Sequence, residues 1–401
     1  MTQATPPSSP LRIGMLGLGR AGVAMLPALQ SHPHVRLVAA ADLSARARAQ
    51  FTQDFGLPAH DNPQALCEDP DIDVIYIATP HQFHVEHCRL AAQHGKHIVV
   101  EKPLALSLAE CDAIIEAVER AGVCLTVGHT ASFNPSVGAA RALIRGGTLG
   151  RLRLLNFSAY TSFLYRPRRP EELDTAKGGG VLFNQAPHQV DTARLLGGGM
   201  VASVRATAGV WDAARRTEGA YAALLQFEDG AAASLVYSGY DHFDSGEFRV
   251  STQDERSLTL GSHAVARRAL KKATTPAEEA AMLGEMGYGG SAMRKTLSPD
   301  MFQVELGLAI LSCERADLRL VADGIMVYDD DGKRALPVSY PNGVPGRGNV
   351  FDELWQALQS GTSPLHDARW GKATIEVCLA IQQSARENRE VRLQYQCPLR
   401  D

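Results

Sequence analysis

The sequence predicts two domains, an α/β domain with a doubly wound parallel sheet and then an α+β domain with a mostly antiparallel sheet. Up to about residue 130, short apolar runs alternate with helical patterns, which is typical of parallel strands joined by crossover helices. From about Arg151 the runs alternate apolar and polar residues, and turn sequences such as "EDG" separate them. The 401 residues are enough for two hydrophobic cores.

The composition excludes several classes of protein. The formal net charge of -4 disfavours a nucleic-acid binder, and no apolar run reaches the ~20 residues that span a membrane. Residues 1–10 are polar and proline-rich, so we expect a disordered tail rather than a secretion signal. The seven cysteines show no close pairs and no metal-ligand spacing, so we expect reduced thiols in a cytoplasmic protein.

A glycine pattern near the N-terminus predicts a dinucleotide site. The apolar strand Leu11–Leu16 leads into Gly17, Gly19 and Gly22, and a helical segment follows that ends before Pro33. In this G-x-G-x-x-G pattern the glycines allow a tight turn, the approach of a pyrophosphate and close helix–strand packing. The N-terminus of the helix offers free amides and the positive end of its dipole to the phosphates.

The second predicted strand, "VRLVAAAD", ends on Asp42, which lies 20 positions beyond Gly22. This is the spacing of an acidic residue that binds a ribose hydroxyl, and its charge would repel a 2′-phosphate. Asp42 therefore favours NAD. Arg46 and Arg48 follow closely enough to leave NADP open.

Three motifs directly follow later strands of the first domain: "ATPHQFH", "EKP" and "GHTASFNP". Ligands of such sheets bind beyond the carboxyl ends of the strands, so His129 in the last motif is a candidate for substrate contact. His84 and His87 in "HQFHVEH" are three apart on a helix, but no carboxylate partner is evident, and we expect no metal site.

The stretch "KGGGVLFNQAPHQVD" places three polar side chains directly after a run of glycines and is the first candidate for a catalytic segment. A continuous helical register would place Asn184, His188 and Asp191 on one face, because residues three and four apart are neighbours. That face is either a solvated polar surface or the wall of an active site. Just before it, Arg166, Arg168 and Arg169 lie between prolines, and they either clamp a carboxylate or form a surface loop offset by nearby acids.

Together, "GLGRAG", "ATPHQFH", "EKP" and "GGGVLFNQAPHQVD" occur in the order seen in the glucose–fructose oxidoreductase and inositol dehydrogenase (Gfo/Idh/MocA) family, which the chain resembles over nearly its whole length. The resemblance implies a Rossmann domain at 11–130 and, at 131–395, an α+β domain with a large, mostly antiparallel open sheet. In the family that sheet builds dimers or tetramers. We expect helices near the C-terminus of the second domain to pack back on the Rossmann domain.

The resemblance also implies roles for individual residues. Lys102 would bind the substrate hydroxyl and the nicotinamide ribose, Glu101 would contact that ribose, and His188 would be the acid–base residue. Asn184 stands where many members have an aspartate; it can orient but not take a proton, which argues against an ordinary polyol dehydrogenase. The implied cofactor-binding residues are Gly17, Gly19, Arg20, Ala21, Gly22, Asp42, Thr79, Pro80, His81, His84, Glu101 and Lys102. The implied catalytic and substrate-binding residues are Lys102, Asn184, His188, His129, Arg166, Arg168 and Arg169.

Within the family, "YRPRRPEELDTAKGGGVLFNQAPHQVD", "SCERADLR" and "VYDDDGKRALPV" resemble the phthalate cis-dihydrodiol dehydrogenases. This implies oxidation, with NAD, of a small anionic ring diol that carries two carboxylates, in a cleft between the domains. His188 or Lys102 would be the base. A sugar, inositol or other polyol dehydrogenase, a reductase of a tetrapyrrole or imine, and a non-catalytic NAD-binding regulator remain as alternatives.

One segment of the second domain breaks its strand pattern. Residues 254–297 are charged, alanine-rich and end in glycines, so we expect an inserted, partly helical arm. It either covers the site or reaches a neighbouring subunit, or it is a solvated insertion without a role.

Overall fold

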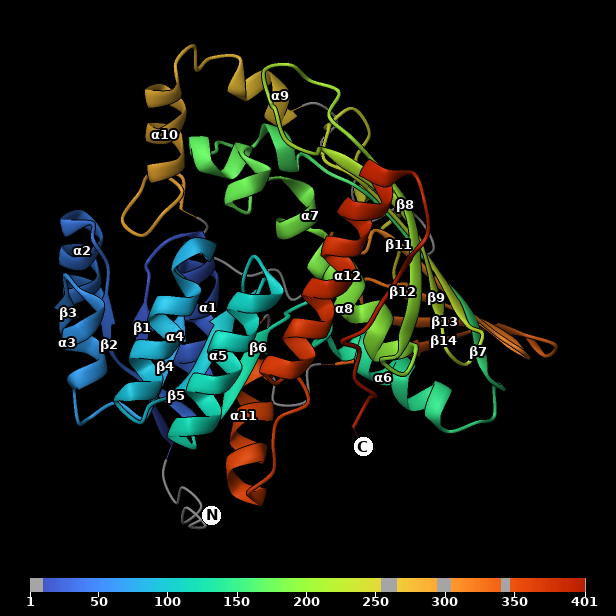
Figure 1. Ribbon diagram of the computed structural model, residues 1–401, viewed down its shortest axis with the longest axis horizontal. Helices are drawn as coiled ribbons and strands as arrows, with labels where there is room; N and C mark the ends of the chain where they lie inside the picture. The colour runs from blue at the N-terminus through green and yellow to red at the C-terminus, as the bar shows by residue number, and fades with distance from the viewer. Residues whose placement is uncertain (1–9, 254–264, 294–303, 340–346, 401) are drawn as a thin grey trace. The chain divides into compact units, whose positions relative to one another are not determined.

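A computed structural model describes residues 10–253, 265–293, 304–339 and 347–400 (Figure 1). The contacts divide the chain into two compact units, each assembled from three stretches of sequence. Of the predicted tail, residues 1–9 lie outside the described residues, and so do 254–264 and 294–297 of the predicted arm. The first unit draws on Met1–His129, Ala281–Pro299 and Val344–Lys372, and the second on Thr130–Ala280, Asp300–Gly343 and Ala373–Asp401.

The first unit is built on a six-stranded parallel sheet with the strand order β3-β2-β1-β4-β5-β6. This confirms the predicted doubly wound Rossmann domain. The central strands are buried almost throughout, as expected of parallel strands covered by helices on both faces. Its elements are β1 Leu11–Leu16, α1 Arg20–Ser31, β2 Val35–Ala41, α2 Ala45–Phe55, β3 Ala59–His60, α3 Pro63–Glu68, β4 Val74–Ile77, η1 His81–Phe83, α4 His84–Gln93, β5 His97–Glu101, α5 Leu108–Ala121 and β6 Leu125–Gly128.

Side-chain caps fix where the helices of this unit begin. The Ser44 hydroxyl accepts a hydrogen bond from Ala47 N at 3.3 Å at the start of α2, and the Ser107 hydroxyl accepts one from Glu110 N at 3.2 Å at the start of α5. Each cap satisfies an amide that the first helical turn leaves without a partner, which is worth about 1 kcal/mol.

A helix from the C-terminal part of the chain completes the first unit. Helix α11, Asn349–Ser360, packs against β5 and β6. Its Trp355 stacks on His34 with ring centroids 4.9 Å apart, and its Phe351 meets Tyr76 edge to face. The unit therefore needs residues that lie more than 200 positions beyond its sheet in the sequence.

The second unit is built on a nine-stranded sheet with the order β14-β13-β12-β11-β7-β10-β9-β8-β15. All neighbouring strands are antiparallel except β7 and β10, which confirms the predicted mostly antiparallel sheet. Its strands are β7 Leu152–Tyr160, β8 Val201–Gly209, β9 Ala220–Phe227, β10 Ala232–Ser238, β11 Leu308–Cys313, β12 Ala316–Val321, β13 Gly324–Asp329, β14 Gly332–Pro337 and β15 Val391–Arg392.

Helices lie against this sheet, and Figure 1 shows α6, α8 and α12 on one of its faces. Every residue of α8 is buried, so this helix is a core element rather than a surface one. Its Arg194 donates to Thr374 Oγ1 at 2.8 Å and to Gln396 Oε1 at 3.0 Å. The helices are α6 Pro135–Arg145, η2 Phe163–Tyr165, η3 Pro170–Leu173, η4 Thr175–Lys177, α7 Gly180–Asn184, α8 Ala186–Leu196, η5 Ser245–Phe248, α9 Val265–Leu270, α10 Pro276–Gly284 and α12 Ala368–Glu387.

Candidate functional site

The glycine loop between β1 and α1 has the shape that a dinucleotide requires. Gly17 has a φ of 103°, and a Cβ there would lie 2.7 Å from the carbonyl oxygen of Ala78. A Cβ on Gly22 would lie 2.2 Å from Gly17 O, so helix and strand meet closely there. A Cβ on Gly19 would meet no atom within 4 Å, which leaves open space at the position expected to face the pyrophosphate. The loop therefore fits NAD.

Asp42 follows β2 and connects this loop to the next helix. Its Oδ2 accepts a hydrogen bond from Leu18 N in the glycine loop, and its Oδ1 accepts one from Ser44 N at the N-cap of α2, both at 2.7 Å. Arg20 and Ala21 open α1 beside the loop, where the amides of the first helical turn are available to phosphate. The carboxylate of Asp42 is thus held at the edge of the predicted ribose site.

The motif after β4 is tied to the motif after β5. The His84 ring lies with Nε2 3.1 Å from Thr79 O and Nδ1 2.8 Å from Pro103 O. His84 has no exposed surface, and burial lowers its pKa while the two carbonyl oxygens oppose that shift. The buried ring lies between the two loops and contacts both. Pro80 and His81, which are half-buried, begin the short turn η1 between Thr79 and His84.

The "EKP" motif lies at the end of β5, and the peptide between Lys102 and Pro103 is cis. Lys102 is half-buried, whereas Glu101 is buried. Glu101 Oε1 accepts hydrogen bonds from Tyr76 Oη at 2.8 Å and from Arg347 Nη1 at 3.3 Å. The Glu101 carboxylate is therefore held at a fixed position beside Lys102 by a hydroxyl and a guanidinium.

Sequence reasoning missed both partners of Glu101. Tyr76 lies inside an apolar strand, where it is indistinguishable from a core residue, and Arg347 lies in the irregular stretch "PNGVPGRGN" without a motif. His129, at the end of β6, is 1% exposed and lies 6.1 Å from the His366 ring, centroid to centroid. His366 in turn contacts Glu353 Oε2 through Nδ1 at 2.8 Å.

In the second unit, the stretch that begins at the glycine run does not form one continuous helix. Helix α7 ends at Asn184, and α8 begins at Ala186, with Gln185 between them. Pro187 explains the break, because it has no amide hydrogen to continue the helical hydrogen bonds from α7. The expectation that Asn184, His188 and Asp191 share one helical register is therefore wrong.

The three side chains are nevertheless buried rather than solvated, with exposed fractions of 8% for Asn184, 5% for His188 and 0% for Asp191. The Asn184 amide donates to Gly178 O at 3.1 Å and to Gly180 O at 2.9 Å, and so it fixes the glycine run. Burial lowers the pKa of Arg194, and the negative charge of Asp191, one turn earlier in α8, opposes this shift.

A network of glutamines and tyrosines holds the start of α8 against the sheet. Tyr237 Oη lies 2.6 Å from Thr161 Oγ1 and donates to Gln185 Oε1 at 3.1 Å. Gln189 Nε2 donates to Val236 O at 3.1 Å, and Tyr221 Oη donates to Gln189 Oε1 at 2.8 Å. These bonds fix the backbone on both sides of His188. The i, i+4 spacing of the two glutamines was the only signal of this network in the sequence.

The arginine loop divides into two kinds of residue. The guanidinium of Arg168 is buried, stacks on Phe163 at 3.9 Å and donates to Phe163 O at 2.9 Å and to Glu172 Oε1 at 3.3 Å. Arg169 pairs with Glu172 Oε2 at 3.3 Å. The side chain of Arg166, in contrast, makes one hydrogen bond among the described residues, from Nε to Ser162 Oγ at 3.3 Å, and no ion pair with a carboxylate there.

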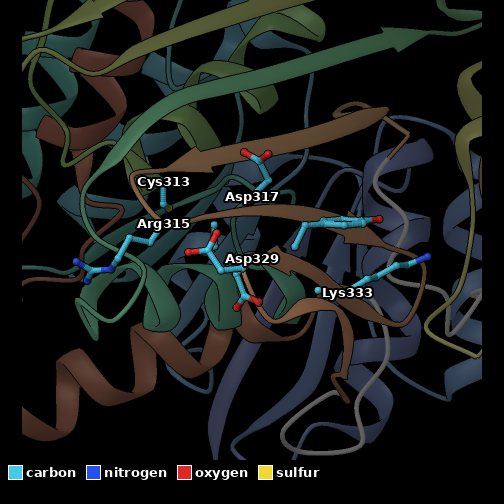
Figure 2. A pocket seen from close by; sticks show the side chains of 9 residues that line it. Cys313, Arg315, Asp317, Asp329 and Lys333 are labelled. Carbon is cyan, nitrogen blue, oxygen red and sulfur yellow. The ribbon is translucent and has the colours of Figure 1, made fainter.

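A separate hollow lies at the turns β11–β12 and β13–β14 (Figure 2). Asp317, Asp329, Arg315 and Lys333 line it with both signs of charge, and none of the predicted site residues does. Over the described stretches of the chain, no helix is long and apolar enough to cross a membrane. The same stretches hold no group of three or more His, Cys, Asp or Glu side chains placed to bind a metal ion.

Comparisons with known proteins agree with this geometry. Residues 11–129 match the model of an oxidoreductase family with an NAD-binding Rossmann fold, and residues 137–256 match the Gfo/Idh/MocA C-terminal domain. The chain is 42% identical over 380 residues, 92% of its own length and 94% of the relative's, to 1-carboxy-3-chloro-3,4-dihydroxycyclohexa-1,5-diene dehydrogenase from Comamonas testosteroni.

Two solved structures share the fold. A protein from Bordetella bronchiseptica RB50 superposes with a TM-score of 0.88 at 43% identity, covering 96% of this chain and 100% of that one. Levoglucosan dehydrogenase in complex with NADH and levoglucosan superposes with a TM-score of 0.72 at 20% identity, covering 96% and 99%, which shows the fold alone. The glycine loop, the "EKP" motif and both matched domains lead to one conclusion: the chain is a dehydrogenase that belongs to the Gfo/Idh/MocA family of oxidoreductases.

Proposed function

We propose that the protein oxidises a cis-dihydrodiol of a ring carboxylate to the corresponding catechol, with NAD as the hydride acceptor. The observation that carries this proposal is Arg166, a half-buried cation without a carboxylate partner among the described residues. The name of the Comamonas testosteroni relative, which describes a carboxylated dihydroxycyclohexadiene, supports the same substrate class.

Arg166 is near the part of the second unit that holds His188. Arg166 donates to Ser162 Oγ at 3.3 Å, and the hydroxyl of the adjacent Thr161 lies 2.6 Å from Tyr237 Oη. Tyr237 in turn donates to Gln185, three residues before His188. A planar guanidinium can bind a carboxylate through two parallel hydrogen bonds and thereby orient the ring that carries it.

The arginine loop has one cation available for a substrate carboxylate rather than two. Arg168 and Arg169 already contact Glu172, so a second carboxylate would have to compete with this internal acid. The proposed class therefore includes dihydrodiols with a single ring carboxylate, and phthalate cis-dihydrodiol is its member with two.

The chemistry requires a base, a stabiliser of the alkoxide and an orienting group. We propose that His188 takes the proton of one ring hydroxyl while the carbon that bears this hydroxyl loses hydride. Bound NAD would accept that hydride. Lys102 would donate a hydrogen bond to the oxygen as negative charge develops, and Arg166 would hold the ring. The resulting ketone tautomerises to an aromatic catechol, which draws the oxidation forward.

The glycine loop, Asp42, Glu101 and Lys102 are the residues that would hold the cofactor. The Asp42 carboxylate suits the ribose hydroxyls of NAD and repels the 2′-phosphate of NADP. We therefore propose NAD rather than NADP as the working cofactor.

The test is NADH formation, followed by absorbance, with purified full-length protein and a panel of alcohols. The panel contains phthalate cis-dihydrodiol, a benzoate cis-dihydrodiol, the same diol without a carboxylate, inositol, glucose and xylose. We expect turnover of the carboxylated diols well above that of the uncharged diol. Preferred turnover of a neutral polyol would overturn the proposed substrate, and binding of NADH without turnover of any alcohol in the panel would favour a regulator.

A further inference from the structure

The C-terminal part of the predicted arm is docked on the nucleotide-binding unit. Tyr288 is 6% exposed, and its ring lies 6.3 Å from that of Phe51 and 6.1 Å from that of Phe55, both in α2. Its hydroxyl donates to Asp54 Oδ2 at 2.6 Å, and its backbone amide donates to Leu18 O in the glycine loop at 3.2 Å. Residues 281–293 thus contact both the loop and the helix that border the predicted ribose site.

The glycines that end the arm make this docking close. Gly289 has a φ of 75°, and a Cβ there would lie 3.2 Å from Gln50 Cβ on α2. A residue with a side chain would be strained at this φ and crowded by the helix. The glycine-rich end "GYGG" is therefore a packing feature and not only a flexible connection.

The docked segment binds the arginine nearest to Asp42 along α2. Arg46 Nη1 lies 2.9 Å from Glu285 Oε1, and Arg46 Nη2 donates to Gly284 O at 2.9 Å. Glu285 Oε2 also accepts a hydrogen bond from Ser291 N at 2.7 Å. The Ser291 amide and Arg46 together lower the pKa of Glu285 to about 2, so its carboxylate is ionised near neutral pH.

The second cation of this region is engaged as well. Arg48 Nη1 donates to Asp42 O at 2.8 Å and to Leu43 O at 3.0 Å. Rossmann domains that accept NADP commonly place an arginine near the end of the second strand to bind the 2′-phosphate. Here Arg46, four positions beyond Asp42 in the first turn of α2, is the candidate for that contact, and its guanidinium is already paired with the Glu285 carboxylate.

We propose that Glu285 is a cofactor-selectivity residue, which lowers the affinity for NADP relative to NAD by pairing with Arg46. A 2′-phosphate would have to displace the Glu285 carboxylate and remain close to its charge and to that of Asp42. NAD has a hydroxyl at this position and does not need Arg46. The inference concerns the cofactor alone, so it stands whichever alcohol is the substrate.

The experiment measures dissociation constants of NADH and NADPH by ligand fluorescence with the full-length protein. We expect Glu285→Gln to tighten NADPH about fivefold, the upper range for one exposed ion pair, and to change NADH less than twofold. Adding Arg46→Met to Glu285→Gln should abolish this gain. The matched control is Glu119→Gln, which removes an exposed acid paired with Arg369 elsewhere in the unit and should leave both constants unchanged.

A further variant separates charge from docking. Tyr288→Phe keeps the ring on Phe51 and loses only the hydrogen bond to Asp54, and we expect it to leave the NADPH-to-NADH ratio unchanged. The inference is overturned if Glu285→Gln leaves this ratio unchanged, if the gain persists without Arg46, or if Tyr288→Phe reproduces it. Tighter binding of NADPH than of NADH by the unaltered protein would refute the proposed NAD preference, independently of what Glu285→Gln does.

Discussion

Replacing Arg166 by leucine tests the proposed carboxylate contact most directly. Among the described residues this side chain makes one weak internal hydrogen bond, so its loss should leave the fold almost unchanged. The free energy of unfolding should fall by less than about 1 kcal/mol. Any large effect on turnover then reports on the substrate rather than on stability.

The expected effect on catalysis follows from the geometry. A charge-assisted hydrogen bond from a guanidinium to a carboxylate contributes about 1.5–3 kcal/mol. Because Arg166 is half-buried, we take a middle value of about 2 kcal/mol, which corresponds to a roughly 30-fold loss in kcat/KM. The loss should appear with carboxylated diols and be absent with the uncharged diol.

Two neighbours in the same loop provide the controls. Arg169→Leu removes a cation that is already paired with Glu172, so kcat/KM should change less than about threefold. Arg168→Leu should instead cost about 3 kcal/mol of stability, because it removes a buried cation and leaves Phe163 O and Glu172 Oε1 without their side-chain donor. Steady-state kinetics and urea unfolding of the three variants measure both quantities. Equal losses on charged and uncharged diols for Arg166→Leu would refute the carboxylate contact.

Three further predictions follow from the second unit. His188→Ala should lower kcat by roughly 100-fold or more and leave the dissociation constant of NADH unchanged, because the base acts in the chemical step. Arg194→Met should lower the free energy of unfolding by about 3 kcal/mol in urea titrations, because Thr374 and Gln396 lose a buried donor. Burial raises the pKa of Glu172, but Arg168 and Arg169 lower it by more than burial raises it. The pKa of Glu172 therefore lies below its ordinary value. The ionised form of Glu172 therefore stabilises the folded state near neutral pH, and this stabilisation is lost as the pH falls through the lowered pKa. Glu172→Gln lacks this contribution at every pH, so its melting temperature should depend less on pH between pH 7 and pH 3 than that of the parent.

Each of these outcomes has a definite contradiction. Unchanged turnover in His188→Ala would remove this histidine from the mechanism and leave Lys102 as the base. An Arg194→Met variant as stable as the parent would mean that the neighbouring polar groups find other partners. A Glu172→Gln variant that loses stability in acid as steeply as the parent would show that the ion pairs of the arginine loop add nothing to folding.

The architecture could be predicted because its signals are local. The strand Leu11–Leu16, the spacing of the glycines and the distance to Asp42 each depend on neighbouring residues, and the structure shows the same strand and the same loop. The alternation in the second half likewise requires only that one face of each strand be buried. Both sheets could therefore be predicted from the sequence.

The details of the site depend on contacts between distant residues, and the sequence carries little trace of these. Glu101 meets Arg347, 246 positions away, and Tyr237 meets Gln185, 52 positions away. The break between α7 and α8 had a visible cause in Pro187, yet the spacing of polar residues suggested one continuous helix. Which arginine of a cluster remains without a carboxylate depends on side-chain packing, and so the sequence could not separate Arg166 from Arg168.

Each unit is assembled from three separate stretches of sequence, and this restricts how the gene can be divided or recombined. The nucleotide-binding unit takes its sheet from the start of the chain, one covering helix from residues 349–360 and a docked segment from residues 281–293. A gene fragment that ended near residue 129 would encode the strands without the tryptophan that stacks on His34 or the glutamate that pairs with Arg46. A single crossover after residue 129 would therefore separate the glycine loop from the segment that contacts it. If Glu285 sets the cofactor preference as proposed, that preference can be transferred only when residues 281–293 accompany the strands and the glycine loop.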